Sequence, residues 1–399
     1  GSYGEVGNDQ IGGDRFLYLP SSYGAASDSG VNKYNFGLAS NPYTSLMIVE
    51  NKIGNPDLTW EKAKKMNVGV DINLFNNCLT ASFDIFKEKR NNILANRSTS
   101  PMIIGANLPA YNFGEMENRG WEMDLNFRHH IQDFHYWARF NYSFARNEII
   151  YMDEVQKRYD YQMTTGRRKN QFFGLIFDGY YNSWEEINAL DRPKSSWSGN
   201  QLQPGDVKYV DVNQDGVIDD YDMVPIGYTP VPEIIYGFSF GAQYKGFDFS
   251  ILFQGADNVS IKYFGRSMWP FAKGEESAKS LIKERWTQER YEAGEKITFP
   301  RLSLNPNGET DHNYRPSTLW IRDASYLRLK NLEVGYTFTG GFVKRLNLNS
   351  VRLYFNGSNL FTWTDVVDLD PEAPSRSGNV EINTYPLQKV YNIGLNINF

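Results

Sequence analysis

The chain has 399 residues and a formal net charge of −6, and these properties restrict the classes of protein to which it can belong. A nucleic-acid-binding protein needs a basic face, so the acidic balance argues against nucleic acid as a partner. No stretch approaches the ~18 consecutive apolar residues that a membrane-spanning helix requires. A single cysteine, Cys78, excludes internal disulfides.

Strict alternation of apolar and polar residues recurs along the chain and predicts strands with two different faces. Residues 1–6 are typical of the end of a strand already in progress, so we expect that earlier strands and an exported N-terminal part are absent from this sequence. In 66–74 the even positions are apolar, and 79–85 repeat the alternation after the tight-turn pair Asn76-Asn77. The strands predicted in chain order are 1–6, 63–75, 78–90, 118–130, 134–148, 233–244, 246–257, 323–338, 349–363 and 386–399.

The connections between these strands alternate between long and short. Short turns are expected at 76–77, 131–133 and 245–246, and a medium connection at 339–348. The long connections are 7–62, 91–117, 149–232, 258–322 and 364–385. Outer-membrane β-barrels have this asymmetry, with short periplasmic turns and long extracellular loops. With the long loops outside, the last strand runs inward and the C-terminus is periplasmic.

Two folds other than a large membrane barrel could also contain strands of this kind. A soluble β-sandwich also has half-apolar strands, but they are usually shorter, and it does not need loop lengths that alternate strictly. Ten strands could close as a small barrel, but the truncated first strand favours part of a larger one. Within the long connections, helical spacing predicts a helix over 275–290, with its apolar side packed against protein, and 168–181 is interpreted as an extra strand.

Several stretches resemble SusC/RagA-like TonB-dependent receptors, and they follow the order found in that family. The stretches are GSYGEVGNDQIG (1–12), NPDLTWE (55–61), NRGWE (118–122), GDVKY (205–209) running into DVNQDG (211–216), YLRLKN (326–331), NLFT (359–362) and DPE (370–372). Each stretch alone is a weak signal, but together they span nearly the whole chain.

The resemblance implies an all-β fold, a transmembrane antiparallel barrel of about 22 strands closed around a plug. About ten of those strands would lie in residues 1–399, whereas the plug and the N-terminal strands would be absent. It also implies a bacterial outer-membrane location, a SusD-like surface lipoprotein as a lid, and energy delivered through TonB to the missing N-terminal part. The outward face of the barrel would contact outer-membrane lipid.

Residues 211–222 match the calcium-loop pattern at its first, third, fifth, sixth, eighth and twelfth positions. Calcium prefers oxygen ligands, which Asp211, Asn213 and Asp215 can each supply, together with the Val217 carbonyl. Asp222 stands at the position where a longer glutamate is usual. We therefore predict that this loop binds structural Ca²⁺, against the alternative of a turn that is held by its own side-chain-to-backbone hydrogen bonds.

No catalytic motif is apparent, so the sequence predicts no enzyme. His129, His130 and His135 crowd a short turn, where a His-His pair has poor geometry for one metal ion. Tryptophans near the long loops, such as Trp184 and Trp269, could stack on sugar rings, but girdle or loop packing is favoured for each of them. The leading hypothesis is TonB-dependent import of a glycan or oligopeptide. The alternative is a non-transporting barrel that acts as an adhesin or an assembly scaffold.

Overall fold

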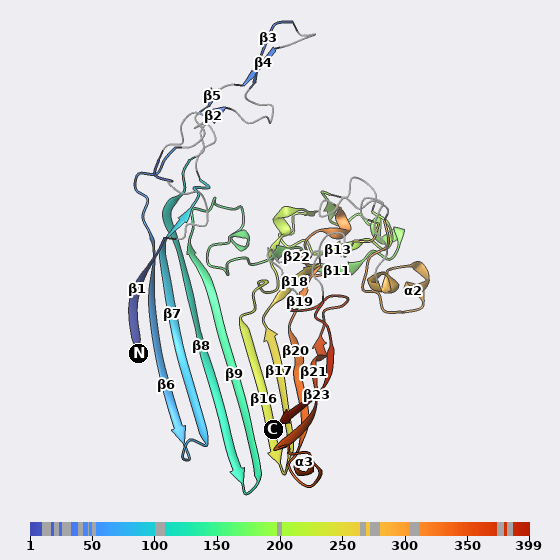
Figure 1. Cartoon of the computed structure of the whole chain (residues 1–399). Coiled ribbons are helices and arrows are strands. Elements are labelled where there is room, and N and C mark those ends of the chain that lie inside the picture. The colour runs from blue at the N-terminus through green and yellow to red at the C-terminus, as the bar shows by residue number, and fades with distance from the viewer. Residues whose placement is uncertain are drawn as a thin grey trace.

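A single antiparallel sheet of ten long strands dominates the chain, and each strand pairs with the next one along the sequence (Figure 1). The computed structural model describes residues 1–9, 17–19, 24–25, 33–38, 43–46, 48–49, 53–99, 108–197, 202–263, 269–271, 280–303, 311–372, 379–380 and 386–399. The strands are β1 (Ser2–Asn8), β6 (Glu61–Leu74), β7 (Leu79–Ala95), β8 (Tyr111–Ile131), β9 (Phe134–Tyr151), β16 (Ile234–Tyr244), β17 (Phe247–Asp257), β20 (Tyr326–Phe338), β21 (Ser350–Thr364) and β23 (Val390–Asn398). The predicted all-β meander is confirmed, with β1 and β23 as the two edges of the sheet.

The short connections gather at one end of the sheet, here named the turn end, and the long ones at the other, the loop end (Figure 1). Lys245 and Gly246 join β16 to β17 with φ angles of 45° and 91°, the two positive values that a type I′ hairpin requires. The medium connection carries α3 (Phe342–Arg345) at the turn end. The amide of Asn349 donates to the carbonyl of Asn398 at 2.8 Å, so the chain also finishes there.

The two faces of the sheet differ in chemistry. One face, here named the outward face, presents apolar side chains that are not covered by a second sheet. Val68, Val70, Ile393 and Leu395 are exposed by 59%, 50%, 81% and 56%, while Leu125 and Phe249 on the same face are half-buried. The opposite, inward face carries polar pairs such as Arg352 with Asp248. This division is the one expected of a barrel wall between lipid and a polar lumen.

Aromatic side chains form two rows on the outward face. Near the turn end, the rings of Phe127 and Tyr136 lie 5.7 Å apart. Toward the loop end, Trp121 stacks on Tyr142 with ring centroids 4.7 Å apart. The six residue-to-residue steps from Trp121 to Phe127 span about 20 Å of strand, close to the ~25 Å apolar band of a membrane barrel. Since β8 has 21 residues, it extends well beyond this band at the loop end.

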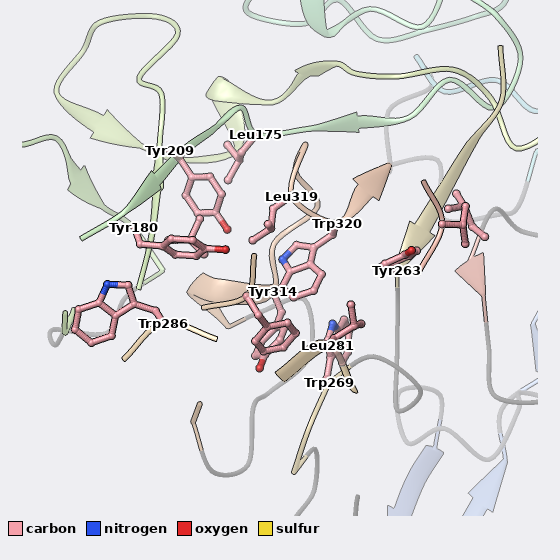
Figure 2. Close-up of a cluster of buried hydrophobic side chains, with 14 of the residues drawn as sticks. Leu175, Tyr180, Tyr209, Tyr263, Trp269, Leu281, Trp286, Tyr314, Leu319 and Trp320 are labelled. Carbon is pink, nitrogen blue, oxygen red and sulfur yellow. The ribbon is translucent and has the colours of Figure 1, made fainter. Parts of the chain in front are cut away.

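The long connections contain a hydrophobic core of their own at the loop end (Figure 2). This cap, formed by the described parts of 152–232 and 258–325, buries Trp320, Tyr263 and Tyr314 almost completely. The indole nitrogen of Trp320 donates to the carbonyl of Asn313 at 2.8 Å, so the largest buried ring also has its polar group satisfied. None of the described helices is long and apolar enough to cross a membrane.

Short elements hold the connections together. The paired strands are β10 (Phe173–Gly174) with β15 (Val224–Pro225), β11 (Phe177–Tyr180) with β13 (Val207–Tyr209), β12 (Lys194–Ser195) with β14 (Val217–Ile218), and β18 (Ser260–Tyr263) with β19 (Ile321–Asp323) and β22 (Asn379–Val380). In the first connection β2 (Gly24–Ala25) pairs with β5 (Ile48–Val49), and β3 (Lys33–Phe36) with β4 (Tyr43–Leu46). The helical turns are η2 (Asp160–Gln162), α1 (Trp184–Ile187), η3 (Asp220–Asp222), η6 (Ser280–Glu284), α2 (Gln288–Glu292) and η8 (His312–Tyr314).

Two expectations for the long connections need correction. The single helix predicted over 275–290 is wrong where the chain is described, because η6 and α2 are separate turns. The amide of Trp286 between them donates to the carbonyl of Phe299 at 2.8 Å, which replaces a helical hydrogen bond. The apolar side does pack inward as expected, with Leu281 and Trp286 in the cap core. The extra strand predicted over 168–181 is two short strands, β10 and β11.

Candidate functional site

A cavity of about 450 Å³ lies at the loop end, against the inward face of the sheet. Its wall comes from β6, β7, β8 and β9, and its other side from two segments that fold back over the strands, 168–169 and 229–233. The charged lining residues are Glu61, Glu88, Arg90, Glu117, Arg168, Lys169 and Glu233. Both signs of charge therefore face one space on the side of the sheet that would form the lumen.

Ion pairs on β6 and β7 fix the charges along the wall of this cavity. The guanidinium of Arg90 donates to Glu88 at 2.8 Å, and the ammonium of Lys65 lies 3.2 Å from the other oxygen of the same carboxylate. Glu61 lies 3.9 Å from Arg90. Arg90 therefore stays partly exposed beside Glu61 and Glu88. A charged ligand can replace one of these carboxylates as the partner of Arg90.

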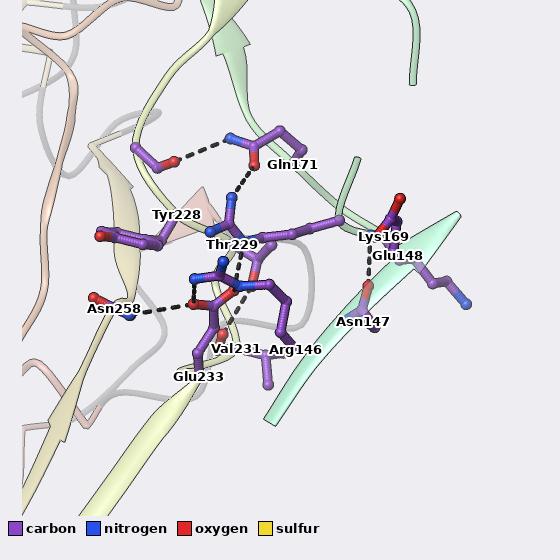
Figure 3. Close-up of polar contacts among 12 residues, drawn as sticks. Arg146, Asn147, Glu148, Lys169, Gln171, Tyr228, Thr229, Val231, Glu233 and Asn258 are labelled. Atoms are coloured by element: carbon purple, nitrogen blue, oxygen red, sulfur yellow. Dashed lines mark hydrogen bonds and ion pairs between the residues drawn. The ribbon is translucent and has the colours of Figure 1, made fainter. Parts of the chain in front are cut away.

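Glu233 closes the cavity and anchors the return of the longest connection to the barrel wall (Figure 3). Its side chain is only 4% exposed and accepts two hydrogen bonds from Arg146, at 2.9 and 2.8 Å. Arg168 also donates to it, as does the amide nitrogen of Asn258 at 3.2 Å. Burial opposes ionisation of Glu233, but the hydrogen bonds from Arg146 and Arg168 hold its pKa below the usual range. No motif in the sequence marks this residue.

The predicted calcium loop is folded, and its side chains are used by its own backbone. Asp211 accepts from the Gly216 amide at 2.8 Å, and Asn213 accepts from the Asp215 amide at 3.0 Å. Asp215 in turn accepts from the amide of Val217 at 3.0 Å, so four of the five predicted residues are joined in one turn.

Asp222, the fifth predicted calcium ligand, is completely buried and accepts from the amides of Val212 at 2.8 Å and Asp219 at 2.9 Å. Burial raises the pKa of Asp222, although these amides act in the opposite direction. One observation fits a cation: the Oδ1 atom of Asp211 is buried and has no hydrogen-bond partner. Among the described residues, however, no three His, Cys, Asp or Glu side chains are grouped to hold a metal ion. Calcium binding at this loop therefore stays a prediction.

His312 is a buried group in the cap to which the sequence assigned no role. Its Nε2 atom lies 2.7 Å from the carbonyl of Val207, and its Nδ1 atom lies 2.9 Å from the hydroxyl of Ser195. Burial lowers the pKa of His312, so the ring is neutral and donates from Nε2. It joins β12, β13 and η8 and is a structural link within the cap.

The open sheet, its apolar outward face with two aromatic rows, and its polar inward face define a segment of a transmembrane β-barrel. A family model described as "TonB dependent receptor-like, beta-barrel" matches residues 17–360. The chain belongs to this family of outer-membrane receptors, and its relatives are of the SusC/RagA kind.

Individual relatives agree with this assignment. The chain is 27% identical to TonB-dependent receptor P3 of Formosa agariphila, covering 100% of the chain and 39% of the relative. It is 26% identical to TonB-dependent receptor SusC of Bacteroides thetaiotaomicron, covering 100% of the chain and 37% of the relative. A solved structure of the RagAB peptide transporter matches with a TM-score of 0.67 and 25% identity, covering 100% of the chain and 40% of that structure's chain. The chain thus spans about two fifths of the length of these relatives.

Proposed function

We propose that the receptor imports an oligopeptide or glycan across the outer membrane, driven by TonB and assisted by a SusD-like surface lipoprotein. In this proposal the loop end is extracellular, and the turn end and Phe399 are periplasmic. The observation that carries it is the charged cavity on the inward face, between the barrel wall and the segments that fold back from the cap.

The lining of the cavity favours an oligopeptide over a neutral glycan. It carries both carboxylates and basic groups, which complement the two termini and the side chains of a peptide. Sugar rings are usually bound on aromatic faces, and none of the residues that line the described cavity is aromatic. The similarity to the RagAB peptide transporter supports the same choice. No enzymatic step is part of this proposal.

The cap provides the surface that we assign to the lipoprotein lid. It has its own hydrophobic core and is joined to the barrel wall by the Glu233 ion pairs, so it can present a fixed surface to a partner. The exposed Trp184 on α1 and the fully exposed Leu190 lie on this cap. Purification of the intact receptor in mild detergent should recover a SusD-like lipoprotein, and repeated failure to do so would count against the lid.

Ligand binding can be tested directly on the intact receptor by calorimetry, with a mixed pool of charged oligopeptides and a mixed pool of neutral oligosaccharides as probes. We expect heat of binding from the peptide pool, and at least tenfold weaker binding after Arg90→Gln, because a charged hydrogen bond contributes roughly 1.5–3 kcal/mol. Lys89→Gln, on the opposite face of the same strand and paired with Glu115 outside the cavity, is the matched control and should bind as the wild type does. Binding confined to the oligosaccharides would reverse the choice of substrate.

A further inference from the structure

Three basic side chains form a row across the outward face of β7, β8 and β9 at the loop end. Lys87 pairs directly with Arg119, and Arg119 pairs directly with Arg146. Like charges that face each other across neighbouring strands destabilise a sheet. A bound anion would remove this repulsion.

Nearby carboxylates neutralise the row only in part. Glu117 lies 2.9 Å from Lys87, and Arg146 is held by Glu233. The carboxylates nearest to Arg119 lie at 3.9 and 4.0 Å, which is at the limit of an ion pair, and its side chain is 58% exposed. Arg119 is therefore the member of the row that is best placed to bind an external anion.

A cavity of about 310 Å³ lies beside Arg119 and extends this basic region. Four arginines line it, and Glu148 is the one carboxylate among its described lining residues. Glu233, outside this lining, already pairs with Arg146 and Arg168. Guanidinium groups match the oxygens of phosphate in pairs of parallel hydrogen bonds, which makes arginine the usual phosphate-binding residue. The arginines are Arg119, Arg146, Arg167 and Arg168.

The position of the row relative to the membrane indicates where the anion comes from. Arg119 is two residues beyond Trp121 on the same face of β8, about 7 Å along the strand. Trp121 and Tyr142 belong to the aromatic row at the loop end, and such aromatic residues lie at the level of the lipid headgroups. The basic row therefore lies at the outer edge of the headgroup region, where lipid phosphates are found.

We propose that Lys87 and Arg119, at the edge of the arginine-lined cavity, bind a phosphate-bearing lipid headgroup. This inference depends on the barrel being in a membrane and not on which nutrient is transported. The proposed orientation enters only in naming the leaflet, which would be the outer one. Failure of lipid binding would thus leave the proposed import unaffected.

The test uses the intact receptor in lipid nanodiscs made with phosphorylated lipid A or with its dephosphorylated form, and native mass spectrometry to count retained lipid. We expect selective retention of the phosphorylated lipid. Lys87→Gln combined with Arg119→Gln should weaken it about 25-fold, since each basic residue near an anionic surface contributes roughly a factor of five. Lys62→Gln combined with Lys64→Gln, on the same face of β6, is the matched control and should have a much smaller effect.

Three results would overturn the proposal. The first is equal retention of the phosphorylated and dephosphorylated lipids. The second is equal loss in the two double variants. The third is displacement of the lipid by inorganic phosphate at comparable concentration, which would make this a site for a soluble anion. Heat-modifiable migration on gels would confirm that each variant barrel is folded before its lipid content is compared.

Discussion

At the scale of single residues, Glu233 determines where the longest connection rejoins the barrel. Its carboxylate is shared by Arg146 on β9, Arg168 in the first part of this connection and Asn258 after β17. A buried charge is stable only when it is paired and hydrogen-bonded. Glu233 is the buried member of this set, whereas Arg146 and Arg168 keep part of their side chains exposed.

Replacing Glu233 should loosen the segment 225–233 without unfolding the sheet. Glu233→Ala leaves two partly exposed guanidinium groups without their carboxylate, and we expect a local loss of about 1–3 kcal/mol. Hydrogen exchange of the 225–233 amides should increase accordingly. Glu185→Ala changes an exposed carboxylate of the cap and serves as the control. Unchanged exchange in Glu233→Ala would show that the contact does not hold the segment.

Glu233 also makes the stability of the segment 225–233 depend on pH. Because Arg146 and Arg168 hold the pKa of Glu233 below its ordinary value, the folded state favours the carboxylate. The stabilisation is fully present above the ordinary glutamate pKa of about 4.3 and is lost as the pH falls through the lower folded value. Exchange at 225–233, corrected for intrinsic rates, should be constant from neutral pH to about pH 5 and should rise only in stronger acid. Glu233→Gln should abolish that rise.

Calcium in the loop 211–222 is predicted on the pattern of its oxygen ligands and on the unpartnered Oδ1 of Asp211. The intact receptor, purified with calcium present, should contain stoichiometric calcium by elemental analysis. Asp215→Ala should remove it and make the loop more sensitive to protease, while the barrel stays folded. Asp220→Ala, which alters a neighbouring exposed carboxylate, is the control. Absence of calcium from the wild-type receptor would mean that backbone hydrogen bonds alone hold the loop.

At the scale of elements, the alternation of apolar and polar residues predicted all ten strands of the sheet, but it did not predict all of their ends. β8 begins at Tyr111 and β7 continues to Ala95, seven and five residues beyond the predicted limits of 118 and 90. Beyond the apolar band the residues no longer alternate, since β7 ends with two asparagines followed by Ile93, Leu94 and Ala95. The register also shifts between Arg90 and Ile93. The alternation that identifies a strand is lost there, although the strand continues.

Because one face of the sheet contacts lipid and the other faces the lumen, a charged residue should destabilise the barrel more on the outward face than on the inward face. Val70→Arg places a cation on the outward face within the apolar band and should cost about 2–4 kcal/mol. Asn73→Arg introduces the same side chain on the inward face of the same strand and should cost much less. The folded fraction after refolding into lipid vesicles, measured by heat-modifiable gel migration, compares the two. Equal losses would contradict the assignment of the faces.

The cap shows where local pattern fails. Leu281, Ile282 and Trp286 have helical spacing, yet they reach a common core from separate turns, because Trp286 forms its backbone hydrogen bond with Phe299. The spacing of apolar residues indicates which side chains are buried. It does not reveal a backbone hydrogen-bond partner such as Phe299, which lies thirteen residues further along an irregular segment. The prediction that these side chains pack inward was therefore correct, while the helix was wrong.

At the scale of the whole molecule, the class of protein could be predicted from the sequence and the candidate cavity could not. Strand alternation and loop lengths are local properties, and they were sufficient to predict a membrane barrel. The cavity depends on which parts of a long loop fold back onto the wall, namely 168–169 and 229–233. Arg168 reaches Glu233 across 65 positions of sequence, and no motif marks either residue.

TonB-dependent uptake is the most direct test of import through this barrel. Cells that make the intact receptor, with or without functional TonB, would be given labelled charged oligopeptides and labelled neutral oligosaccharides, and accumulation inside the outer membrane would be measured. If the barrel imports peptides, we expect them to accumulate only when TonB is functional, and to accumulate less in Arg90→Gln. Ligand that stays at the cell surface regardless of TonB, with no accumulation of either probe, would contradict import and would indicate an adhesin or scaffold instead.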